Sequence, residues 1–122
     1  LTFSQEIKMD GAIIVSTPQE VALLDVKRGI KMFDKLGVKI LGLVDNMSFF
    51  IGDDGKKYKI FGEGGVKKTA EEFEKQFLGE IPIDSEVGRT SDNGKPIVED
   101  NSEHKISQIY LDFAKKIKSN YF

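Results

Sequence analysis

The sequence predicts an α/β fold in which helices flank a parallel β-sheet. Three short apolar segments, at 11–16, 38–44 and 77–82, have the length of buried strands, and the first is rich in β-branched residues. Segments with helical spacing of apolar residues separate and follow these strands. A strand, a crossover helix and a strand of these lengths form a right-handed βαβ unit, so the alternation predicts an α/β domain.

The first strand follows a short N-terminal segment. Residues 1–9 are expected to form an amphipathic turn with Phe3 and Ile7 on one side. The uninterrupted apolar run at 11–16 then predicts a strand that is buried on both faces, as strands of parallel sheets commonly are.

The crossover helix has start and stop signals. We expect Thr17 to cap its N-terminus, with Pro18 at the first helical position and Glu20 completing a capping box. Gly37 supplies a left-handed C-terminal stop. The strand at 38–44 follows and ends in Asp45-Asn46.

A β-hairpin is predicted at about 49–61, because two apolar segments flank the turn sequence Gly-Asp-Asp-Gly at 52–55. A helix from about 65 to 76 is expected next, before the strand at 77–82. Its inward-facing residues are expected to be Val66, Ala70 and Phe73.

The C-terminal part is predicted to be mostly helical. Asp84 is placed to cap a short helix that runs through Arg89. A turn at 92–94 leads into residues 95–98, which we expect to be extended. The last helix, from about 102 to 119, is expected to present one apolar stripe, made of Ile106, Ile109, Tyr110, Phe113 and Ile117.

Composition narrows the class of protein. The chain is 39% hydrophobic and 31% charged, which is ordinary for a soluble globular domain and too apolar for disorder. Its net charge of −2 gives no indication of nucleic-acid binding. No apolar run reaches the roughly 20 residues of a membrane helix, so we expect a soluble, cytoplasmic protein that does not enter a membrane.

The chain has no cysteine, which excludes disulfides and thiolate metal ligands from these residues. Because it opens at Leu1 without methionine or a targeting segment, we expect it to be part of a longer protein.

Ligands of open parallel sheets bind beyond the carboxyl ends of the strands, which here are 16–19, 45–48 and 82–84. Asn46 is the most informative residue there, because its amide can donate and accept hydrogen bonds at a purine edge. The alternative is that Asn46 only shapes the loop, as asparagine often does. Thr17 and Asp84 are each explained by helix capping alone.

Three other features favour structural interpretations. The Gly-rich segment 64–69 resembles a phosphate-binding loop followed by Lys-Thr, but Lys67 stands where a glycine is required, so we interpret it as a helix start. His104 has no triad or metal partner at a recognisable spacing and is expected to be exposed in the first turn of the last helix. The lysines near the C-terminus are expected to form the solvated face of that helix.

Five ordered motifs cover essentially the whole chain. They are DGAIIVSTPQEVALLD at 10–25, GLVDNMS at 42–48, IFGEGG at 60–65, FLGEIPID at 77–84 and SDNGKPIV at 91–98. Together these motifs resemble the Mrp family, also called ApbC-like iron–sulfur carriers, which are P-loop ATPases related to MinD and ParA. The resemblance implies that residues 1–122 are the C-terminal half of a single P-loop ATPase domain, with the hairpin at about 49–61 as an insertion.

The resemblance also implies a function. Relatives are ATPases that bind nucleotide as dimers and pass iron–sulfur clusters to apo-proteins, so ATP, Mg²⁺, a second copy and apo iron–sulfur clients are expected for the complete protein. The residues that it places at the nucleotide are Asn46 at the adenine, Pro82, Ile83 and Asp84 beside the base, and Thr17 and Gln19 at the active edge of the sheet.

Two departures from the family pattern matter. The lysine-bearing P-loop and the catalytic aspartates should precede Leu1, so we expect an N-terminal P-loop half as a partner and no ATP hydrolysis by this chain alone. Relatives usually carry Cys-x-x-Cys where this chain has residues 52–55, so these residues cannot hold a 4Fe–4S cluster in the family's manner. Either another element holds the cluster, or the ATPase is kept without the carrier role. A MinD- or ParA-like scaffolding protein and a non-enzymatic interaction module are the alternatives.

Overall fold

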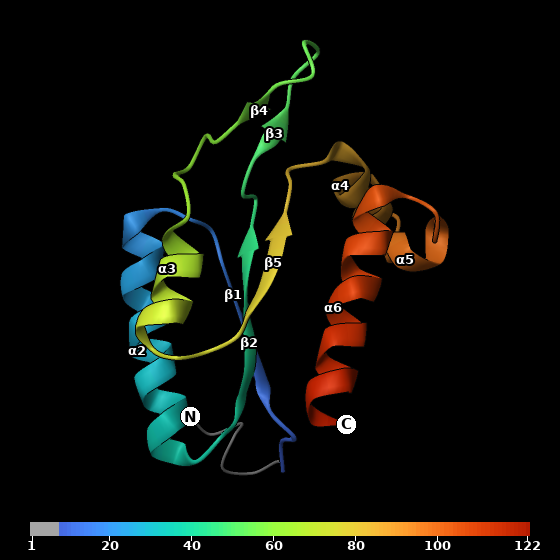
Figure 1. Cartoon of the computed structure of the whole chain (residues 1–122). Coiled ribbons are helices and arrows are strands. Elements are labelled where there is room, and N and C mark those ends of the chain that lie inside the picture. Colours follow the sequence, from blue (N-terminus) through green and yellow to red (C-terminus); the bar gives the residue numbers. More distant parts are fainter. Residues whose placement is uncertain (1–7) are drawn as a thin grey trace.

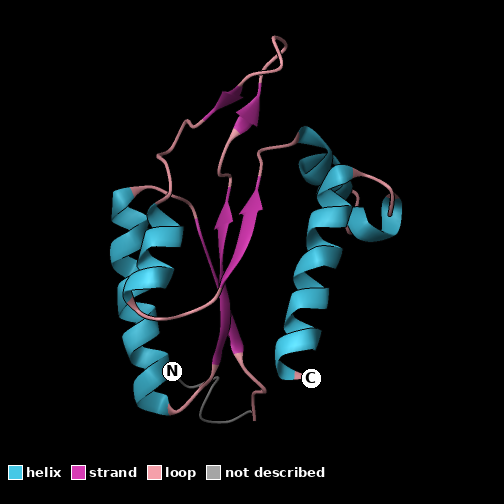
Figure 2. Cartoon of the chain, in the orientation of Figure 1, coloured by secondary structure: helices cyan, strands magenta, loops and turns pink. Residues whose placement is uncertain are grey.

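The computed structural model describes residues 8–122, and the turn expected at 1–9 with Phe3 and Ile7 falls largely outside them. A three-stranded sheet lies between two helical layers (Figure 1). Helices α2 (Glu20–Leu36) and α3 (Gly65–Glu72) cover one face, and α6 (Lys105–Tyr121) covers part of the other. A small hairpin projects beyond one end of the sheet, as the secondary-structure colouring in Figure 2 makes clear.

The sheet has the order β1–β2–β5, with β1 (Ala12–Ser16), β2 (Ile40–Asn46) and β5 (Phe77–Ile81) all parallel. The predicted α/β fold with a parallel sheet flanked by helices is therefore confirmed. The central strand is buried from end to end except for the half-buried Asn46, because both helical layers reach it.

The expectation that the first strand is buried on both faces is wrong. Ile14 packs into the core beneath α2, but Ile13 and Val15 on the opposite face are 43% and 57% exposed. The reason is that α6 packs on β5 and β2, and no described element of comparable size covers this face of β1.

The crossover helix begins later than expected. Its N-cap is Gln19, which makes no side-chain cap hydrogen bond, so the capping box of Thr17 and Glu20 is wrong. The Thr17 hydroxyl instead donates to Gln19 Oε1 at 3.2 Å, and Pro18 lies before the helix. The C-terminal stop is confirmed, because Gly37 has φ +73° and its N–H bonds back to Asp34.

The hairpin is confirmed as an antiparallel pair, β3 (Phe50–Ile51) and β4 (Lys57–Tyr58). Gly52 and Gly55 close its turn by a backbone hydrogen bond of 2.9 Å, and Tyr58 hydrogen-bonds Asp54 across the tip. Helix α3 follows the hairpin and buries Val66 and Ala70 against the sheet, and Phe73 packs against the same cluster, as predicted. The helix itself ends at Glu72, earlier than expected.

The C-terminal part contains α4 (Ser85–Asp92), α5 (Ile97–Asp100) and α6. Asp84 caps α4 as predicted, but residues 95–98 are not extended, since α5 begins within them. The buried Ser107 hydroxyl lies 3.1 Å from the Ile97 carbonyl and 2.6 Å from that of Asn101, which holds this short helix against α6.

His104 is not exposed as expected. Its side chain is 20% exposed, its Nδ1 accepts a hydrogen bond from the Ile106 N–H at 3.1 Å, and its Nε2 lies 3.9 Å from Asp84 Oδ2. It is therefore the N-cap of α6.

Two apolar clusters, one on each face of the sheet, form the core. The first joins α2, α3 and the sheet through Val26, Ile30, Ile40, Leu43, Val66 and Ala70. The second joins the other face to α5 and α6 through Val44, Leu78, Ile81, Ile97, Ile106 and Phe113. Among residues 8–122, no helix combines the length and apolar composition needed to cross a membrane.

Candidate functional site

A cavity of about 330 Å³ lies where the carboxyl ends of β2 and β5 meet α4 and α6. It brings four of the six predicted site residues together. Its lining consists of Asn46, Met47, Ile81, Pro82, Ile83, Asp84, Val87, Gly88, Ser91 and Tyr110. The position agrees with the rule that ligands of open parallel sheets bind beyond the carboxyl ends of the strands.

The side-chain amide of Asn46 lines this cavity, and only its oxygen is already hydrogen-bonded. Its Oδ1 accepts a hydrogen bond from the Met47 N–H at 3.0 Å, so the loop-shaping interpretation is correct for that oxygen. Among the hydrogen bonds of residues 8–122, none uses the side-chain nitrogen of Asn46, which leaves two N–H donors for a ligand. Met47 itself has φ +55°, a conformation that costs a non-glycine residue of order 1 kcal/mol and is concentrated at functional sites.

Asp84 is engaged in structure as well as lining the cavity. Its Oδ1 accepts the Glu86 N–H at 2.9 Å, and its Oδ2 lies 3.9 Å from both His104 Nε2 and Lys105 Nζ. Ile83 is held by its N–H, which donates to the Phe49 carbonyl at 2.7 Å. These contacts fix the loop after β5 against the base of the hairpin and the start of α6.

Thr17 and Gln19 do not line this cavity. Thr17 borders a separate hollow of about 340 Å³ between the end of β1 and α2. The structure therefore places Thr17 and Gln19 apart from the other four candidates.

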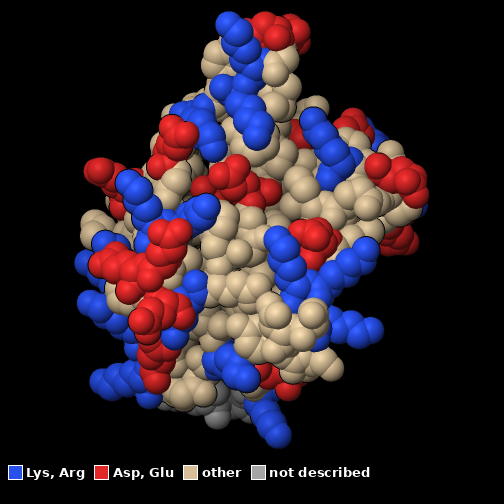
Figure 3. Space-filling model, in the orientation of Figure 1, with Lys and Arg blue, Asp and Glu red and all other residues tan. Residues whose placement is uncertain are grey.

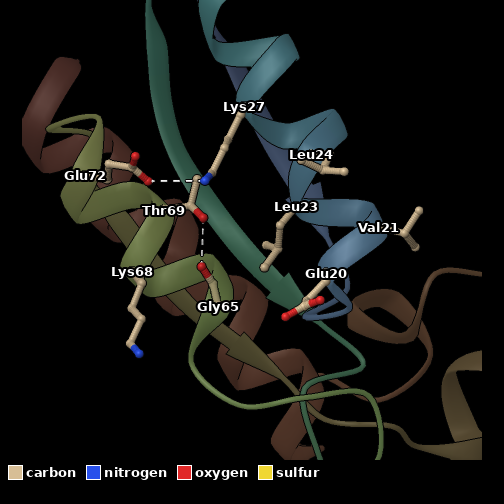
Figure 4. Close-up of a pocket in the computed structure, with 9 residues that line it drawn as sticks. All are labelled: Glu20, Val21, Leu23, Leu24, Lys27, Gly65, Lys68, Thr69 and Glu72. Carbon is tan, nitrogen blue, oxygen red and sulfur yellow. Dashed lines mark hydrogen bonds and ion pairs between the residues drawn. The ribbon is translucent and has the colours of Figure 1, made fainter.

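The Gly-rich segment at 64–69 forms the start of α3, as interpreted from the sequence. The Thr69 hydroxyl is buried and donates to the Gly65 carbonyl at 2.9 Å within the helix. A groove of about 660 Å³ runs beside it between α2 and α3 (Figure 4). Lys27 crosses this groove to Glu72 at 3.5 Å, while Lys68 points away from that pair. The groove is thus an interhelical surface with charged edges.

Asp45, immediately before Asn46, is a buried carboxyl at this edge of the sheet. It is 1% exposed, and neither carboxylate oxygen has a hydrogen-bond partner among the described residues. Burial, with the nearby Glu80 carboxylate, raises the pKa of Asp45 to about 6, against smaller lowering effects of the Ser48 hydroxyl and Lys59.

Val87 and Tyr110 line the cavity but were not predicted from the sequence, whereas Met47 lies within the predicted segment 45–48. Tyr110 was expected on the buried stripe of the last helix, but it is 40% exposed and lines the cavity beside Phe113, with the two rings edge to face at 6.3 Å. Its polar ring at the border of an apolar stripe is the signal that distinguishes it from its aliphatic neighbours.

A parallel sheet between helices, with a cavity at the carboxyl edge, defines an open-sheet α/β protein. Residues 1–118 match the family model described as ParA, NUBPL iron-transfer P-loop NTPase. The chain belongs to this family.

Curated relatives agree with this assignment. The chain is 41% identical over 116 residues to the iron-sulfur cluster carrier protein of Aquifex aeolicus, covering 94% of this chain and 32% of the relative. It is 46% identical over 118 residues to the iron-sulfur cluster transfer protein NUBPL of Dictyostelium discoideum, covering 96% and 36%. The chain thus spans about a third of the length of these relatives.

Solved structures place the fold among P-loop NTPases. A nucleotide-binding protein from Archaeoglobus fulgidus, solved in complex with ADP, matches with a TM-score of 0.71 and 36% identity over 86% of this chain and 42% of its own. The cell division ATPase MinD of Pyrococcus furiosus matches with a TM-score of 0.71 at 23% identity, covering 90% of this chain and 43% of its own. The second likeness is one of fold alone.

Proposed function

We propose that this chain is the adenine-binding side of an ATP-binding iron–sulfur cluster carrier. The observation that carries the proposal is the cavity at the carboxyl edge, where Asn46, Pro82, Ile83 and Asp84 converge. Relatives named as iron-sulfur carrier and transfer proteins support an iron–sulfur cluster as the cargo. A solved relative in complex with ADP supports a nucleotide as the ligand.

The chemistry of the cavity suits a purine. Its walls are largely apolar and present Ile83, Val87 and the Tyr110 ring, which favour an aromatic base over a charged phosphate. The free Asn46 amide N–H groups can donate to a ring nitrogen of the base. ATP, when bound, supplies the phosphate chemistry, while these residues bind and orient the base.

Truncation of the Asn46 amide tests this assignment. In the full-length protein, Asn46→Ala is expected to weaken Mg-ATP binding roughly tenfold, since a lost hydrogen bond from its half-buried amide is worth about 1–2 kcal/mol. Calorimetric titration measures the affinity, with Asn93→Ala, at an exposed position outside the cavity, as the matched control. Unchanged affinity of Asn46→Ala would remove this residue from the site.

The phosphates and Mg²⁺ are assigned to a separate part of the domain. Among residues 8–122, no group of three or more His, Cys, Asp or Glu side chains is arranged to hold a metal ion.

The outer edge of β1 has no strand partner among the described residues, and the exposed Ile13 and Val15 lie on the same strand. An N-terminal P-loop half that adds a strand there and covers these side chains fits this surface. Residues 1–122 are then the C-terminal half of one ATPase domain, which has no hydrolytic activity alone.

A homodimer is the proposed assembly. Val21 and Leu24 of α2 are 71% and 58% exposed beside the groove between α2 and α3. Glu20 lies on the α2 side of this groove and Lys68 on the α3 side (Figure 4). This apolar patch with opposite charges at its edges is suited to a two-fold contact, in which Glu20 of one copy meets Lys68 of the other. Light scattering of the full-length protein with and without Mg-ATP tests it, and a monomer under both conditions would contradict it.

The cluster is cargo, and this chain cannot hold it through thiolates, because it has no cysteine. We therefore place the cluster ligands on another element of the full-length protein. Cluster reconstitution, followed by transfer to an apo iron–sulfur acceptor, decides between a carrier and a MinD-like positioning protein. Failure of both steps would favour the positioning role. A cytoplasmic location belongs to the same proposal and is tested by cell fractionation.

A further inference from the structure

The buried carboxyl of Asp45 lacks the partners that a buried charge requires. It is 1% exposed, and both of its oxygens are without a hydrogen-bond partner in the described part of the chain. A buried, unpaired carboxylate is strongly disfavoured, and such a group tends to take up a proton instead. The function proposed above makes no use of this carboxyl.

The groups around Asp45 do not neutralise it fully. Ser16, Asp45 and Glu80 are register partners across β1, β2 and β5, so their side chains share one face of the sheet. Glu80 has the same charge as Asp45, and its only ion-pair partner among the described residues is Lys59, at 3.5 Å. The Ser16 hydroxyl donates a hydrogen bond to the Thr17 carbonyl at 2.8 Å.

The two helices on this face add no opposite charge to the core. They pack apolar side chains against the sheet there, Ile30 from α2 and Val66 and Ala70 from α3. The Ser48 hydroxyl, fully buried at the base of the hairpin, is a further polar group beside Asp45.

Both ends of the hairpin are held beside this carboxyl pair. At the entering end, the Ser48 N–H donates to the Ile81 carbonyl at 3.0 Å, and the Phe49 carbonyl accepts from Ile83 at 2.7 Å. At the leaving end, Lys59 reaches Glu80 and lies 5.6 Å from the centre of the Phe49 ring. In Figure 3, lysine side chains gather along the hairpin above a group of acidic side chains at its foot.

We propose that Asp45 is a proton-dependent latch at the base of the hairpin. The protonated carboxyl is neutral and can stay buried next to Glu80, so the base of the hairpin stays docked on the sheet. Loss of the proton leaves two adjacent carboxylates facing the single ammonium of Lys59. The base of the hairpin then opens more often, because opening admits water to Asp45.

The pH range follows from the direction of the shift. Burial and Glu80 raise the pKa of Asp45 from 3.8 to about 6 in the docked state, and opening to water returns it toward the lower value. An acid with a raised pKa favours the docked state at low pH. Docking therefore weakens as the pH rises from about 4 to about 6, and stays level above that.

Hydrogen exchange at the base of the hairpin measures this opening. After correction for intrinsic exchange, we expect the protection of the Ser48 and Ile83 amides in the full-length protein to fall about tenfold between pH 4.5 and pH 7. Asp45→Asn is expected to abolish the pH dependence and keep high protection throughout. Asp53→Asn, at the exposed hairpin tip, is the matched control and should behave as wild type.

Glu80→Gln provides a second test that does not depend on the folding of Asp45→Asn. Removing the neighbouring charge is expected to lower the midpoint of the pH dependence, and the carboxyl carbon of Asp45 should titrate at the same lower midpoint by NMR. Equal protection of Ser48 and Ile83 at both pH values in wild type would overturn the latch. The same pH dependence persisting in Asp45→Asn would also overturn it.

Discussion

Replacing Leu78 by alanine is expected to lower the free energy of unfolding by about 2–5 kcal/mol, the range for removing a fully buried leucine side chain. Leu78 is 0% exposed in β5 and belongs to the cluster that joins the sheet to Ile106 and Phe113 of α6. The loss has two parts, the transfer of the side chain and the cavity left beneath α6. Urea denaturation of the protein measures it, with Leu111→Ala, on the exposed side of α6, as a control of small effect.

The same site gives a sharper test through Gly42 on β2. A Cβ added to Gly42 lies only 2.5 Å from Leu78 Cγ, so Gly42→Ala alone is expected to cost about 1–3 kcal/mol through overpacking. In the Leu78→Ala background the added methyl enters the cavity, and the same substitution should be neutral or stabilising. Additive costs in the double variant would show that the two residues do not contact each other.

Asp45→Asn is expected to stabilise the protein at pH 7 by about 1–3 kcal/mol, an unusual result for substitution of a buried residue. The raised pKa of about 6 means that the folded state disfavours the ionised carboxyl, and asparagine removes that charge without changing the shape. The wild-type free energy of unfolding should therefore fall as the pH rises from about 4 to about 6, while that of Asp45→Asn stays level.

Thermal unfolding of both proteins at pH 4 and pH 7 distinguishes this outcome from a packing effect. Wild type and Asp45→Asn should be nearly equal in stability at pH 4, and Asp45→Asn should be the more stable of the two at pH 7. If Asp45→Asn is destabilised to the same extent at both pH values, the substitution acts through packing. If it is destabilised more at pH 7 than at pH 4, the folded state stabilises the ionised carboxyl and the raised pKa is wrong.

Local patterns were sufficient to predict most elements. The sheet, the hairpin, the Gly37 stop and the Asp84 cap each depend on a few residues close in sequence, and the structure confirms all of them. The meeting of Asn46 with residues 82–84 was also predictable, because the carboxyl ends of parallel strands share one edge of the sheet.

Features that depend on distant contacts could not be predicted. A strand such as β1 has the same apolar run whether or not its outer face is covered, so the exposure of Ile13 and Val15 follows only from the position of α6. Helix α5 is four residues long and depends on Ser107 of α6, which no local signal near Pro96 reveals. The positive φ of Met47 is likewise set by the folded loop.

If the base of ATP lies in the cavity at the carboxyl edge, photolabelling of the full-length protein with 2-azido-ATP should mark the residues that line it. Label is expected on peptides that contain Met47, Ile83 or Tyr110, and it should be lost when excess ATP is present. Label on residues 64–69, with none at the cavity, would contradict this placement of the base and assign the nucleotide to the Gly-rich start of α3.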